Sequence, residues 1–123
     1  MAELRNNVKS PQPLPRVLGL RIDGSEVATS AGVAGLDEGA KDVTISKGSG
    51  GTSNEVTIAF NTAFAAAPVV SATVITDDCH VRIKSVSASQ VVLETVQNDA
   101  NGTGVDDADM HVMILGHDSA TRY

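Results

Sequence analysis

The chain has very few aromatic residues. Only 2% of its 123 residues are aromatic, namely Phe60, Phe64 and Tyr123, and it has no tryptophan. A hydrophobic core must therefore be built from Val, Ile, Leu and Ala, which bury less apolar area per side chain than aromatic rings do. We expect such a thin core to be completed by contacts between subunits.

Cysteine and long apolar runs are also scarce. The single cysteine, Cys79, cannot form a disulfide within the chain, which fits assembly in a reducing cytoplasm. No apolar stretch reaches the roughly 18 residues of a membrane-spanning helix, so we expect no membrane partner. The N-terminal residues lack a continuous apolar signal region, so we expect no export.

The charge of the chain is negative and unevenly distributed. Glu3 against Arg5, Lys9 and Arg16 gives residues 1–16 a net charge of +2, which leaves −8 for the rest of a chain of net −6. An acidic body argues against a nucleic-acid partner, because phosphate binding needs a basic surface. A mildly basic leader on an acidic body suggests that the two parts meet different surfaces.

Residues 1–16 predict an extended N-terminal arm. Pro11, Pro13 and Pro15 stand at alternate positions, and each proline fixes its own φ and favours an extended conformation in the residue before it. The arm is either a flexible tail or a stiff docking segment that loses little entropy on binding. We therefore divide the chain into an arm, 1–16, and a body, 17–123.

The body predicts an all-β fold, a small antiparallel β-sandwich of about seven or eight strands. Apolar residues alternate with polar ones, most clearly from Val56 to Phe60, and turn signals recur about every 8 to 12 residues without a helical period. We expect strands at 17–22, 42–46, 55–60, 69–75, 81–85, 90–96 and 110–115. The last is the most apolar and is expected to be central; 69–75 alternates little and is expected to be covered on both faces.

Two loops carry candidate metal ligands. Asp77, Asp78, Cys79 and His80 are adjacent, but neighbouring side chains in a strand point in opposite directions, and zinc needs three or four converging ligands. We therefore expect a polar turn and no zinc. The acidic loop 97–109 has oxygen ligands and a glycine at position six counted from Asp99, but Met110 stands where a calcium loop has glutamate. A solvated loop is expected, with calcium binding as its alternative.

No catalytic constellation is present. The segment KGSGGT at 47–52 places its lysine before the glycines and leads into a strand, whereas a phosphate-binding loop places Lys-Ser/Thr after them at a helix start. No serine has nucleophile-elbow spacing. The adjacent carboxylates Asp77/Asp78 and Asp106/Asp107 are not flanked by the apolar residues that would raise the pKa of one of them for acid catalysis. We expect no enzyme and no cofactor.

The spacing Phe60-x3-Phe64-x3-Pro68-x-Val70, followed by alternating strands and the closing HVMILG at 111–116, resembles the H-type lectin-like sandwiches. Such domains occur in eukaryotic agglutinins and in bacteriophage virion proteins. The resemblance covers about residues 55–116. The closing strand has no tryptophan and almost no aromatic face is available for a sugar, so no lectin binding residue is carried over.

The chain as a whole resembles bacteriophage capsid decoration (cement) proteins, in which an extended arm crosses coat subunits and a compact, often trimeric β-body sits at a local symmetry axis. The resemblance implies a virion protein, assembled in the host cytoplasm, whose partners are the major capsid protein or other virion subunits and further copies of itself, with a trimer favoured. The residues expected to contact the partner are Leu4, Arg5, Val8, Lys9, Pro11, Pro13, Leu14, Pro15 and Arg16.

Two other hypotheses stay open at this point. The first is a tail fibre, baseplate or receptor-binding module that recognises a host surface glycan, with the arm as its attachment. The second is a cellular enzyme or a metal-dependent binding protein. Specific binding to a glycan array would favour the former, and stoichiometric zinc or calcium in the purified protein would favour the latter.

Overall fold

Seven β-strands make up the described part of the chain. The computed structural model describes residues 12–24, 42–47, 54–105 and 108–122. No helix occurs among these residues, and therefore no helix that could cross a membrane. The strands are β1 (Gln12–Ile22), β2 (Val43–Lys47), β3 (Glu55–Phe60), β4 (Val69–Val74), β5 (Cys79–Val86), β6 (Gln90–Gln97) and β7 (Met110–Arg122).

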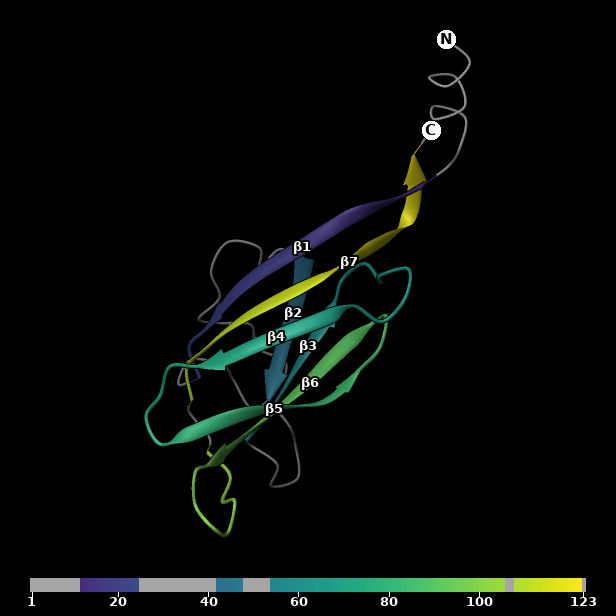
Figure 1. The fold of residues 1–123 in the computed structure, drawn as a ribbon. Helices are drawn as coiled ribbons and strands as arrows, with labels where there is room; N and C mark the ends of the chain where they lie inside the picture. The colour runs from purple at the N-terminus through teal and green to yellow at the C-terminus, as the bar shows by residue number, and fades with distance from the viewer. Residues whose placement is uncertain (1–11, 25–41, 48–53, 106–107, 123) are drawn as a thin grey trace.

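The strands form two antiparallel sheets that pack face to face. One sheet has three strands in the order β1-β7-β4, and the other has four in the order β2-β3-β6-β5 (Figure 1). The turn at 75–78 carries the chain from β4 in the first sheet to β5 in the second. The predicted all-β sandwich is confirmed, and so is the central position of the most apolar strand, because β7 lies between β1 and β4.

Alternation along the strands builds the core. In β3 the inward residues Val56, Ile58 and Phe60 are buried, while the residues between them are half-buried on the outer face. The same period of two runs through the other inner strands, as a pleated strand requires. The fourteen side chains of the core cluster are Leu18, Leu20, Ile22, Val43, Ile45, Val56, Ile58, Phe60, Phe64, Val91, Leu93, Met110, Val112 and Ile114.

Two strands are longer than the sequence pattern predicts. Strand β1 starts at Gln12 and not at Val17, so its first five residues were assigned to the arm but belong to the three-stranded sheet. Strand β7 continues to Arg122, although the residues after Leu115 were expected to be a tail. Each extension pairs with the other, for example Gln12 with Arg122, and neither was visible as an apolar alternation.

The expectation that 69–75 is covered on both faces is wrong. In β4 the residues alternate between exposed and half-buried, and Val69 leaves 70% of its surface exposed. The reason is its position at an edge of the three-stranded sheet, which has the four-stranded sheet on one face only. A strand with little alternation is typically buried on both faces, but here Val69, Ser71 and Thr73 point outward and are exposed.

Candidate functional site

The paired ends of β1 and β7 form a two-stranded ribbon that projects from the sandwich (Figure 1). Strand β4 pairs with β7 only as far as Leu115, so Gln12–Arg16 and 116–122 lie beyond the three-stranded region. We call this element the projecting ribbon. A two-stranded ribbon without a packed face is marginally stable in water, so it gains stability from whatever it contacts.

The base of the projecting ribbon is braced against the body. Phe64 forms an isolated antiparallel bridge with Asp118, and the Ala65 N–H donates a 2.8 Å hydrogen bond to the carbonyl of His117. Among the described residues, no strand other than β1 pairs with β7 beyond Asp118. The register of the ribbon also shifts between Pro13 and Pro15. This shift separates the base of the ribbon, which contacts the body, from its tip.

Prolines fit this edge because, among the described strands, β1 has a neighbour on one side only. Proline has no N–H to donate, so it is tolerated where a ladder is incomplete. Pro13 pairs with Thr121 and Pro15 with His117. The extended conformation predicted from the alternating prolines is therefore confirmed for Gln12–Arg16, within a strand instead of a free arm.

Arg16 is held by the body of the molecule. Its Nη1 donates a 2.6 Å hydrogen bond to the Thr62 carbonyl, its Nε lies 3.6 Å from Asp118 Oδ1, and its guanidinium carbon lies 4.5 Å from the centroid of the Phe64 ring. Only 12% of its side chain is exposed. The structure thus gives Arg16, which the sequence suggested as a partner contact, an internal anchoring role.

The other expected partner contacts are distributed along and before β1. Leu14 is half-buried and Pro15 is exposed, while Pro13 belongs to the strand. Leu4, Arg5, Val8, Lys9 and Pro11 lie outside the described residues. The structure therefore places the point where residues 1–11 join the body at the tip of the projecting ribbon.

A hollow of about 530 Å³ lies beside the base of the projecting ribbon. Its walls are small and mostly apolar, and they are Pro15, Ala65, Ala66, Ala67, Pro68, Val69, Leu115, Gly116 and His117. Gly116 allows the chain to approach Phe64 closely, because a Cβ at this position would lie 2.7 Å from the Phe64 ring. We call it the ribbon-base hollow. The run of three alanines before Pro68 was the only sequence signal for it.

The turn at 77–80 makes local hydrogen bonds. Cys79 Sγ donates to the Thr76 carbonyl at 3.4 Å, and His80 Nδ1 lies 2.6 Å from Asn98 Oδ1. Partial burial raises the pKa of the Cys79 thiol, and the negative charges of Asp78 and Asp77 raise this pKa further. Such a thiol carries less thiolate than an ordinary cysteine and is correspondingly less nucleophilic.

In the acidic loop, the Asp99 side chain stabilises the turn that follows it. Its Oδ1 accepts hydrogen bonds from the backbone N–H groups of Asn101, Gly102 and Thr103 at 3.1, 2.6 and 3.4 Å. Gly102 has a φ of 60°, a left-handed conformation that glycine adopts without strain. Of the three other candidate calcium ligands of the loop, Asp106 and Asp107 lie outside the described residues, and Asp109 Oδ1 accepts a 3.0 Å hydrogen bond from the Gly24 N–H. Within the described ranges, no three His, Cys, Asp or Glu side chains are grouped to hold a metal ion.

Comparisons with protein-family models, with curated proteins and with solved structures find no match for this chain. Its function must therefore be argued from its own surfaces. The features best suited to contact another molecule are the projecting ribbon and the ribbon-base hollow, which adjoin each other at Pro15, Gly116 and His117.

Proposed function

We propose that this chain is a non-enzymatic structural protein of a bacteriophage virion, a capsid decoration protein that docks on the coat through its N-terminal arm and stabilises the head. The observation that carries the proposal is the projecting ribbon, which extends the proline-containing segment away from the core as a strand. An extended, conformationally restricted segment loses little entropy when it lies along a partner.

The arrangement separates the docking parts from the body. Residues 1–11, with Arg5 and Lys9, join the tip of the projecting ribbon, whereas Arg16 fixes its base to Thr62 and Asp118. Through these contacts at its base, the projecting ribbon connects the arm firmly to the sandwich. Under this proposal Arg5 and Lys9 face acidic coat surface, while Leu4 and Val8 fill apolar grooves of the coat.

Deletion of residues 1–11 tests this proposal. The deletion must stop before Gln12, because Gln12–Arg16 are part of β1 and a larger deletion would damage the three-stranded sheet. We expect the shortened protein to keep its circular dichroism spectrum and its melting temperature, and to lose co-sedimentation with coat particles that lack the decoration protein. Undiminished co-sedimentation of the shortened protein would contradict the proposal.

A charge-matched pair of variants sharpens the test. Arg5→Ser with Lys9→Ser removes two positive charges from the arm, and Arg82→Ser with Lys84→Ser removes two from the outer face of the four-stranded sheet. Only the first pair should weaken binding to the coat and reduce its dependence on salt, since only those charges are proposed to meet acidic coat surface. Equal effects of both pairs would show a non-specific contribution of net charge.

The ribbon-base hollow does not favour glycan recognition. Its lining contains no Phe, Tyr or Trp side chain and no carboxylate, so it offers neither a flat apolar ring surface for a pyranose nor strong acceptors for sugar hydroxyls. Its alanine and proline walls suit an apolar side chain of a protein partner. A glycan array with specific binding that is lost on mutation of this hollow would favour the tail-fibre or receptor-binding alternative.

A further inference from the structure

The two outer faces of the sandwich differ in character. The outer face of the four-stranded sheet is polar, with Arg82 paired to Glu94 and Lys84 donating a 2.9 Å hydrogen bond to Glu55. The outer face of the three-stranded sheet instead exposes four large apolar side chains. They are Val17, Val69, Met113 and Leu115, which are 59%, 70%, 57% and 49% exposed.

These four side chains are adjacent across the strands. Leu115 of β7 pairs with Val17 of β1 on one side and with Val69 of β4 on the other, so the three form one apolar row. Met113 occupies the next outward position of β7, between Gly19 and Ser71. We call this surface the outer apolar face. Its apolar area is on the order of 400 Å², within the roughly 300–600 Å² of the largest apolar patch on a typical monomer, and such a patch is often functional.

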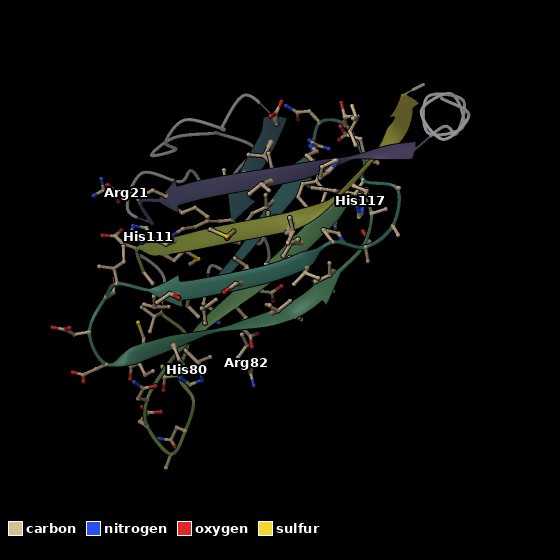
Figure 2. All side chains as sticks on the ribbon, turned by 45° about the horizontal axis from the view of Figure 1, so that its top comes forward. Arg21, His80, Arg82, His111 and His117 are labelled. Atoms are coloured by element: carbon tan, nitrogen blue, oxygen red, sulfur yellow. The ribbon has the colours of Figure 1, made fainter. Side chains whose placement is uncertain are left out.

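The outer apolar face also has a hollow of about 420 Å³ beside the apolar row. The hollow exists because Gly19 and Ser71 are small, and a Cβ at Gly19 would meet no atom within 4 Å. Its far end is formed by Arg21 and His111, which lie together at one end of the sheet, with His117 towards the other (Figure 2). The apolar row of Val17, Leu115 and Val69 therefore forms a ridge, and the hollow lies next to this ridge on the same face.

We propose that the outer apolar face packs against the same face of a second copy of this chain. With a two-fold axis across the strands at the level of Met113, the row of Val17, Leu115 and Val69 lies over the hollow of the other copy, and the reverse holds as well. One patch that carries both a ridge and a hollow is what a two-fold interface requires. This inference does not depend on the proposed function.

Charge supports a second copy as the occupant. The chain has a net charge of −6, so most contacts between two copies are repulsive. Yet no outward residue of the three strands between Val17 and Arg21, Val69 and Thr73, or His111 and Leu115 is a carboxylate. The two-fold axis also places the two Arg21 side chains at opposite ends of the interface. This face lets two acidic molecules meet without carboxylates in contact.

The area of the face indicates a weak pair. Three strands about 4.8 Å apart, each with six residues rising about 3.4 Å, give a projected face of roughly 300 Å². A standard-size interface buries about 800 Å² on each partner, so this face is well below standard size, as expected of a weak, transient pair. We therefore expect a concentration-dependent equilibrium between monomers and dimers, in place of the trimer implied by the resemblance to decoration proteins.

Sedimentation velocity of the full chain over a wide concentration range tests the pairing. We expect the wild type to shift from monomer to dimer, and Met113→Lys to remain monomeric. Thr57→Lys, which adds the same charge to the outer face of the four-stranded sheet, should leave the dimer intact. A wild type that stays monomeric at every concentration, or that forms a trimer, overturns the pairing.

Gly19→Val distinguishes a specific fit from general stickiness. This change makes the face more apolar but fills the hollow, and valine favours the strand conformation, so the monomer should fold at least as well. Ridge-into-hollow packing predicts at least a tenfold weaker dimer, whereas non-specific hydrophobic association predicts a stronger one. The second result would overturn the proposed geometry.

The outcomes also separate this inference from the proposed function. Deletion of residues 1–11 should abolish coat binding and leave the dimer unchanged, while Met113→Lys should abolish the dimer and leave the arm able to bind. If the wild type is monomeric and Met113→Lys loses coat binding, the coat covers the outer apolar face and self-association is overturned.

Discussion

Arg16 and Phe64 are predicted to be energetically coupled, and a double-mutant cycle measures the coupling. The guanidinium carbon lies 4.5 Å from the centroid of the Phe64 ring, at the base of the projecting ribbon. Arg16→Met keeps the aliphatic stem but removes the charge, and Phe64→Leu keeps an apolar side chain but removes the ring. The double variant completes the cycle.

The expected magnitudes follow from burial. Only 12% of the Arg16 side chain is exposed, so its contact with the ring is partly desolvated and is worth about 1 kcal/mol. Phe64→Leu also loses the edge-to-face contact with Phe60, whose ring centroid lies 4.8 Å away, at a cost of about 1 kcal/mol. For a domain of this length, 1 kcal/mol corresponds to about 4 °C in melting temperature.

Urea denaturation followed by circular dichroism, at one fixed protein concentration, gives the four free energies of unfolding. The ion pair with Asp118 and the hydrogen bond to Thr62 are lost equally in both arms of the cycle that remove Arg16, so they cancel. A second cycle of Arg16→Met with Phe60→Leu should give a smaller coupling than the first, because these two side chains are linked through the Phe64 ring that both contact. A coupling near zero would show that the contact between the Arg16 guanidinium and the Phe64 ring does not stabilise the fold.

Two further predictions concern close packing and thiol reactivity. Gly116→Ala should lower the free energy of unfolding by about 1–3 kcal/mol, because the new Cβ would lie 2.7 Å from the Phe64 ring; combining it with Phe64→Leu should restore part of the loss in a thermal melt, and additive losses would argue against the clash. Burial raises the pKa of the Cys79 thiol and Asp78 raises it further, so Asp78→Asn should lower this pKa, increase the thiolate fraction and speed alkylation by iodoacetamide near pH 8. Asparagine also accepts the φ of 60° at position 78, and an unchanged alkylation rate would mean that the carboxylate has no influence on the thiol.

The sequence alone determined the fold class and most of the inner strands. The strand predicted at 55–60 has those bounds in the structure, because Val56, Ile58 and Phe60 alternate with polar or small residues and therefore select one buried face. The central position of β7 likewise followed from its apolar character. Local periodicity is enough to predict the bounds of a strand that has one solvent-exposed face and one buried face.

Tertiary structure decided where the edges lie and what they expose. Pairing of Gln12–Arg16 with the end of β7 depends on contacts about a hundred residues apart in the chain, so proline spacing alone suggested a free arm. The sequence shows that Val69 and Leu115 are apolar, but only the sheet order shows that they adjoin on a face that no other described strand covers. Burial depends on which elements pack together, and that information is non-local.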